Sequence, residues 1–266
     1  MSESTERERP ADREVVALDI AAPPDVVWLS LRDPTELTRW FGWDYDGLAD
    51  EIQQIFFDSV VEGEHGDVRT LAWPDGDAIA VAPFQGGTFL TITRRTRGAT
   101  ADGAASAPTA AAGGAPAGSA VGTFDEIDEG WNQFAQQLRY VVERNPQGRR
   151  RTVSAIDLDA GPRGAGPVYR LGVSLTDDVP IGGEWEFRRT IEGEEYVEGG
   201  TVWYRSEHQR GFVVTSPARE GLLVVQTTPV AVRPPHGRVS LVLSTYGLDD
   251  DEFARVERRW RRWWGL

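Results

Sequence analysis

Cysteine and lysine are both absent from this 266-residue chain, and only one methionine is present. The lack of cysteine excludes disulfides, thiol nucleophiles and cysteine metal ligands, and it fits a cytoplasmic location. No apolar run reaches the roughly 18 residues that a membrane-spanning helix needs. Residues 1–13 are polar and lack the apolar core of a signal peptide, so we expect a disordered tail there.

Positive charge is scarce as well, since 28 arginines face 42 acidic residues and the net charge is −14. This balance argues against a nucleic-acid partner, because phosphate binding needs clustered positive charge. The three histidines, His65, His208 and His236, show no paired metal-ligand spacing. Acidic residues between 44 and 51 do not continue into a calcium loop, so a solvated surface is expected there. We therefore expect neither a metal nor another cofactor.

The first informative pattern is an alternating segment at residues 14–20, typical of a strand, which runs into Pro23-Pro24. This proline pair pre-sets the start of a short helix. Asp33-Pro34-Thr35-Glu36 then has the order of a helix N-cap, with an acceptor, proline and glutamate, and it predicts a second short helix that ends near Trp40-Phe41. The next stretch, 48–61, fits a helix or the start of a strand equally well.

Further along, a hairpin is predicted at residues 70–82 and a strand at 88–93. Residues 98–122 are almost entirely small and polar, which predicts a flexible insertion. A long amphipathic helix is expected over 124–144, with apolar side chains spaced by three or four and an end at Asn145-Pro146. Its stripe contains Ile127, Trp131, Phe134, Leu138 and Val141.

The strand, proline pair and capped helix of residues 15–41, together with the helix that opens at 124–131, resemble the START-like, SRPBCC superfamily, which is Bet v 1-like. Within it they are similar to the type named for homologues of the activator of heat-shock-protein-90 ATPase. The resemblance covers residues 14–145. It implies an α+β helix-grip fold, in which an antiparallel sheet wraps on a long C-terminal helix and leaves an apolar cavity between them.

The remainder of the chain alternates strand patterns with Gly/Pro turns and ends in a helix that opens on Asp249. This order suggests a truncated second copy of the sheet-plus-helix unit, without short helices after its first strand. We expect START-like domains at 14–147 and 150–266. The predicted strands of the second unit are 152–158, 168–175, 184–190, 201–205, 211–215, 222–227 and 238–245, and the final helix carries Phe253, Val256, Trp260 and Trp263 on one stripe.

The resemblance places a ligand cavity in the first domain, against the long helix. A small hydrophobic or amphipathic molecule would bind there without catalysis, and the long helix and the two short helices would move as a lid. The same side chains would also suit an ordinary aromatic core. The predicted lining residues are Trp28, Leu31, Trp40, Phe41, Trp73, Phe89, Ile127, Trp131, Phe134 and Leu138.

Two other functions stay open. The superfamily contains cyclase- and dehydratase-like enzymes, but the apolar stripe offers no ionisable groups, and Ser206 and His208 lack the Gly-x-Ser-x-Gly context of a nucleophile. We therefore expect no catalytic residues. The family name also suggests a chaperone-assisting interaction module, although no motif for a protein partner is visible.

Overall fold

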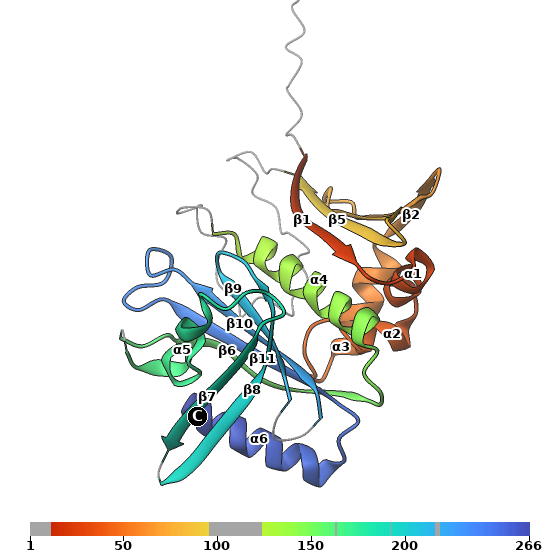
Figure 1. The fold of residues 1–266 in the computed structure, drawn as a ribbon. Coiled ribbons are helices and arrows are strands. Elements are labelled where there is room, and N and C mark those ends of the chain that lie inside the picture. Colours follow the sequence, from red (N-terminus) through yellow and green to blue (C-terminus); the bar gives the residue numbers. More distant parts are fainter. Residues whose placement is uncertain (1–11, 96–123, 163, 192, 216–218) are drawn as a thin grey trace, which may run out of the picture.

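The computed structural model describes residues 12–266 except 96–123, 163, 192 and 216–218, and it contains two antiparallel sheets with a few helices (Figure 1). The chain is therefore α+β, as predicted. The predicted insertion at 98–122 and the tail at 1–11 lie outside the described residues. Sheet A holds β1 (Asp12–Ile20), β2 (Val61–His65), β3 (Val68–Ala72), β4 (Ala78–Phe84) and β5 (Gly87–Arg95). Sheet B holds β6 (Arg150–Asp159), β7 (Glu184–Ile191), β8 (Glu194–Arg205), β9 (Gln209–Val214), β10 (Gly221–Thr228) and β11 (Arg238–Tyr246).

Both sheets follow the same strand order. Sheet A runs β1-β5-β4-β3-β2 and sheet B runs β6-β11-β10-β9-β8-β7, so in each case the first strand pairs with the last and the others follow as a meander. This common order agrees with an internal repeat. The second unit is not truncated, however, because its sheet has six strands and the first has five.

The short helices of the first half lie where the caps predicted them. Helix α1 (Pro24–Arg32) begins after Pro23, and α2 (Pro34–Thr38) begins at the side chain of Asp33, which accepts hydrogen bonds from the backbone N–H groups of Thr35 and Glu36. The ambiguous stretch after residue 48 is helical. It forms α3 (Leu48–Gln53) and one π-helical turn, η1 (Gln54–Asp58).

Helix α4 (Glu126–Arg144) lies between the two sheets (Figure 1). Asp125 caps its start, and Asn145 ends it in the left-handed conformation. One face packs on sheet A, while Tyr140 on the other side lies against Trp203 and Tyr246 of sheet B, with ring centroids 5.7 and 6.0 Å away. Because both faces are covered, α4 is not placed to move as a lid.

Sheet B is covered on its second face by helix α6 (Asp250–Trp264) (Figure 1). Its start is a complete capping box, in which Asp249 and Glu252 exchange side-chain-to-backbone hydrogen bonds. The stripe predicted for this helix is confirmed, since Phe253, Val256, Trp260 and Trp263 are all buried. Of the helices in the described part of the chain, none is long and apolar enough to cross a bilayer.

One predicted strand is wrong. Residues 168–175 fall in helix α5 (Gly166–Arg170) and the 3-10 turn η3 (Val173–Thr176). Pro167 stands in the first turn of α5, where a missing N–H costs nothing, and Gly172 bends the chain at a φ of 62°. The second half therefore does carry short helices after its first strand, contrary to the prediction.

The two halves are joined by buried polar contacts. The Arg150 guanidinium at the start of β6 donates to the carbonyl oxygens of Phe41 (2.8 Å) and Gly42 (2.6 Å) in the first half and to Ser244 Oγ (3.1 Å). Burial lowers the pKa of Arg150. In addition, the Tyr246 hydroxyl donates to the carbonyl of Arg39 at 3.0 Å. These bonds hold sheet B against the loop that follows α2.

Candidate functional site

Most of the predicted cavity residues meet in one cluster between sheet A and α4. Within it, the ring centroids of Phe41 and Phe134 lie 4.6 Å apart, and those of Trp73 and Trp131 lie 5.5 Å apart. These side chains are therefore in direct contact with one another. The predicted residues that share this cluster are Trp28, Leu31, Trp40, Phe41, Trp73, Ile127, Trp131, Phe134 and Leu138.

Two of the predicted residues lie apart from the centre of this cluster. Phe89 is on the face of β5 opposite to the buried Leu90, where it contacts Phe84 at a centroid distance of 5.8 Å. Trp28 is only partly buried, and it lines an open surface cleft with Arg69 and the strand β2. Neither position suits the wall of a cavity between α4 and the sheet.

Three tryptophans between sheet A and α4 have internal hydrogen-bond partners, whereas on the sheet B side of α4 the Nε1–H of Trp203 has none among the described residues. The Nε1–H groups donate from Trp40 to the Ser30 carbonyl (2.9 Å), from Trp73 to the Ile55 carbonyl (2.8 Å) and from Trp131 to Asp77 Oδ2 (3.1 Å). Buried Trp N–H groups normally find a partner, so the sheet A side of this cluster has the character of a completed core.

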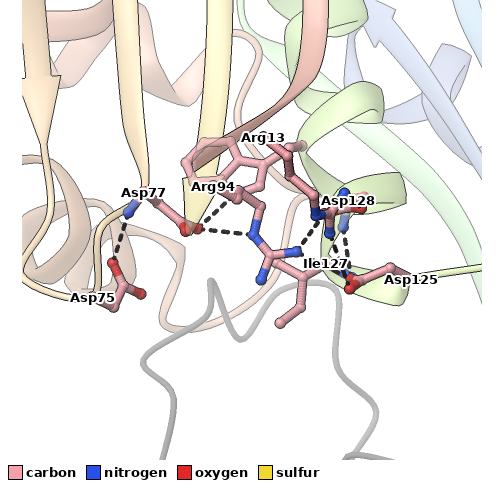
Figure 2. A network of polar contacts seen from close by, with 8 residues as sticks. Arg13, Asp75, Asp77, Arg94, Asp125, Ile127 and Asp128 are labelled. Atoms are coloured by element: carbon pink, nitrogen blue, oxygen red, sulfur yellow. Dashed lines mark hydrogen bonds and ion pairs between the residues drawn. The ribbon is translucent and has the colours of Figure 1, made fainter. Parts of the chain in front are cut away.

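An ionic network closes the end of this core where α4 begins. Figure 2 shows Arg94 between Asp77 on one side and the Asp125–Asp128 turn on the other. Its Nε lies 3.2 Å from Asp77 Oδ2, and its Nη1 contacts Asp125 at 3.1 Å and also Asp128. Burial raises the pKa of Asp77, although Arg94 opposes this. The expectation that no ionisable group reaches the stripe was wrong, because Asp77 bonds Trp131 directly.

A second polar cluster links α4 to the β8–β9 hairpin. The amide of Gln209, which is fully buried, donates to both the carbonyl oxygen (2.6 Å) and Oε2 (2.7 Å) of Glu129 and accepts from the Tyr204 hydroxyl at 2.6 Å. Burial raises the pKa of Glu129 to about 7. Next in the chain, His208 lies against the Phe124 ring, with centroids 5.0 Å apart, while Ser206 Oγ accepts from the Gln209 N–H. This cluster therefore joins the halves.

The interior of the second half differs from that of the first. Glu198, on β8, is 1% exposed and faces α6, directly opposite Phe187 of β7. Its Oε1 accepts from the Nε of Arg259 on α6 at 2.9 Å, but its Oε2 is buried without a hydrogen-bond partner among the described residues. Burial raises the pKa of Glu198 to about 7, although Arg259 acts in the opposite direction.

Several tryptophans of the same interior also bury donors that have no partner. The Nε1–H groups of Trp185, Trp260 and Trp264 are all unpaired among the described residues, whereas Trp263 donates to the Arg170 carbonyl at 2.6 Å. All four rings belong to the core cluster between sheet B and α6. Trp260 stacks on Trp263 with centroids 5.6 Å apart. The arrangement thus combines apolar ring surface with unused donors and one unused acceptor.

Sequence reasoning found the α6 side of this interior and missed the strand side. The helical stripe identified Trp260 and Trp263, but Glu198 stands in a glutamate- and glycine-rich run that looks like a turn. The only available signal was its alternation with Tyr196, and Gly199 and Gly200 interrupt that pattern. Nothing in the pattern indicates that this glutamate pairs with a helix residue 61 positions later.

No family model matches this chain, and no curated protein matches it. Two solved structures can be aligned with it. DynU16, from the dynemicin biosynthetic locus, shares 17% identity over 95% of this chain and 94% of its own, with a TM-score of 0.28. The di-domain ARO/CYC StfQ, from the steffimycin biosynthetic pathway, shares 10% identity over 95% of this chain and 92% of its own, with a TM-score of 0.26. Similarity at this level supports no inference about the fold or the function of this chain.

Proposed function

We propose that this protein binds a small amphipathic molecule between sheet B and α6 and does not act on it chemically. The observation that carries the proposal is the set of buried, unpartnered polar atoms in an otherwise apolar interior: Glu198 Oε2 and the Nε1–H groups of Trp185, Trp260 and Trp264. Leaving one such group unsatisfied costs about 1–3 kcal/mol. A ligand with a few polar groups on an apolar body would remove that cost.

Helix α6 can also move more easily than α4. Its outer face carries Arg255, Arg258, Arg261 and Arg262, all exposed, so only one side of the helix is packed. Lifting it would break its interface with sheet B and its contact with α5, where Trp263 donates to the Arg170 carbonyl. Lifting α4 would break its interfaces with both sheets, together with the hydrogen bonds from Gln209. An entry route beside α6 is therefore the less costly of the two.

Binding in the first half, at the residues named from the sequence, stays a prediction. A ligand there would have to displace Phe134 or Trp131 from rings that they contact and separate Trp131 from Asp77. The layer from α1 to η1 would have to open instead, because α4 is covered on both sides. The second half supports the proposed function better for this reason.

The test measures the affinity of an apolar fluorescent probe, N-phenyl-1-naphthylamine, for the full chain and for two matched variants. We expect Trp260→Phe to weaken binding about ten-fold, since it removes ring area and one donor, and Trp131→Phe to leave it unchanged. Unfolding temperatures of both variants control for loss of structure. The reverse pattern would place the site in the first half, and a wild type that binds no probe would refute the proposal.

A further inference from the structure

Glu198 is held in a defined orientation inside the second-half core. Arg259 donates to its Oε1 from Nε and to the Val197 carbonyl from Nη2, at 2.9 and 3.1 Å. The same guanidinium lies over the Tyr196 ring, 4.7 Å from its centroid. These three contacts fix Arg259, and through it they fix which carboxylate oxygen of Glu198 is used and which is left over.

In the ionised form of Glu198 the oxygen left over is an acceptor. An ionised carboxylate can accept about four hydrogen bonds, and the described residues supply one, to Oε1. Burying an unsatisfied carboxylate oxygen is costly, so a donor brought by a ligand is stabilised strongly at this point. The surrounding side chains are aromatic: Phe187 lies opposite on β7, and Trp185 lies two residues before it on the same face.

Unpaired donors in the same interior require the opposite kind of group. The Nε1–H groups of Trp185, Trp260 and Trp264 can be satisfied only by acceptors. A hydroxyl group both donates one hydrogen bond and accepts others, so one functional group can serve both kinds of partner. An ether or a carbonyl can serve only the tryptophans, and it would leave Glu198 Oε2 unpaired.

We infer that Glu198 selects ligands that carry a hydroxyl group on an aromatic or other apolar body, the hydroxyl donating to Oε2. The inference rests on the proposed function, since it names the ligand class of the same site. Arg259 acts as a positioning residue, because it holds Oε1 and leaves Oε2 directed at the ligand. Analogues in which the hydroxyl is masked are rejected, because their binding leaves the carboxylate desolvated and unpaired.

Two ligands that differ only at this group provide the test. The affinities of 2-naphthol and 2-methoxynaphthalene are measured by calorimetry on the full chain at about pH 8, above the pKa of about 7 that burial gives Glu198. We expect the wild type to prefer 2-naphthol by about ten- to hundred-fold, the value of one hydrogen bond to a charged group. Glu198→Gln keeps the shape and an oxygen for Arg259 but turns an amide N–H₂ toward the ligand, so the preference should disappear or invert.

The control variant is Glu194→Gln, on the same strand, whose carboxylate pairs with Arg262 at 3.0 Å but is 55% exposed. It should keep the wild-type preference. If Glu198→Gln does not fold, Glu198→Asp is measured instead. Its side chain is one methylene shorter, so the carboxylate lies farther from the ligand and the preference for 2-naphthol should fall. A preference that Glu198→Gln and Glu198→Asp leave intact, or equal binding of both ligands to the wild type, overturns the inference and leaves the proposed function standing. If neither ligand binds the wild type, the proposed function fails as well.

Discussion

Buried charges in this molecule are compensated in three different ways. Arg150 is surrounded by carbonyl and hydroxyl oxygens, Arg94 by three carboxylates, and Glu198 by one guanidinium that leaves an oxygen free. The first two arrangements use neutral or ionic partners from elements far apart in the chain, so they serve to join elements. The third arrangement leaves Glu198 Oε2 without a hydrogen-bond partner among the described residues. Glu198 is for this reason our candidate for ligand binding.

We expect Arg94→Met to destabilise the fold by about 3–5 kcal/mol, because it leaves Asp77 as an uncompensated buried carboxylate. Urea unfolding measures the change. The matched control is Arg95→Met, one residue later, whose side chain is 52% exposed and lies 3.8 Å from Asp12. That substitution should change the free energy of unfolding by no more than about 0.5 kcal/mol. Adding Asp77→Asn to Arg94→Met should restore part of the loss, and equal losses at positions 94 and 95 would contradict the account.

At the scale of elements, the helices and strands that were predicted correctly are those with a signal in their own sequence, such as alternation or an N-cap. Alternation gave β1 and β5, an aspartate N-cap gave α2, and a four-residue acidic start gave α6. The missed elements depend on distant contacts. Strand β8 begins at Glu194, earlier than residue 201, because its first half pairs with β7 in a hairpin.

The candidate site was predictable to the same extent. The spacing of apolar residues shows that α4 and α6 each have one apolar face. It does not show that the other side of α4 packs on sheet B. Gln137 is buried because it lies in the junction between the halves. Its amide is oriented to donate to the Trp40 carbonyl (3.1 Å) and to accept from Arg150 (3.0 Å). On the sequence alone this glutamine counts as a solvent-facing position, and so does Glu198.

The difference between the two long helices leads to a prediction about hydrogen exchange. Amides in the middle of α4 should exchange only by global unfolding, since both faces are packed, whereas those of α6 should also exchange through a local opening of lower free energy. Exchange followed by mass spectrometry at increasing denaturant separates the two routes. The amides of β10, in the interior of sheet B, provide the reference. Equal protection of α4 and α6 would rule out α6 as the movable element.

At the scale of the whole molecule, the final helices of the two units differ in the surfaces on which they pack. Each is a sheet whose first strand pairs with its last and whose final helix packs on one face. The helix of the first unit, α4, also covers the outer face of sheet B, whereas the helix of the second, α6, packs only within its own unit, on sheet B and α5 (Figure 1). In the full chain the first unit therefore covers an apolar face of the second.

We accordingly expect residues 150–266, expressed alone, to be insoluble or to melt without cooperativity. Removing the first half exposes an apolar face on sheet B that packs on α4 in the full chain, and exposed patches of this kind drive association. Arg150 also loses the Phe41 and Gly42 carbonyls that it binds. The side chains uncovered are Trp203, Tyr204, Val213, Leu222, Val224 and Tyr246.

Solubility, near-ultraviolet circular dichroism and a thermal scan of the 150–266 fragment measure the dependence, and co-expression with residues 1–149 supplies the control. The co-expressed pair should recover a cooperative transition, because α4 and the loop that Arg150 binds return with the first half. Arg150→Met in the full chain should weaken the same junction without exposing sheet B, so it should lower the unfolding temperature and keep the protein soluble. A fragment that is soluble and melts sharply by itself would show that the covered face of sheet B is stable in water and that the halves fold independently.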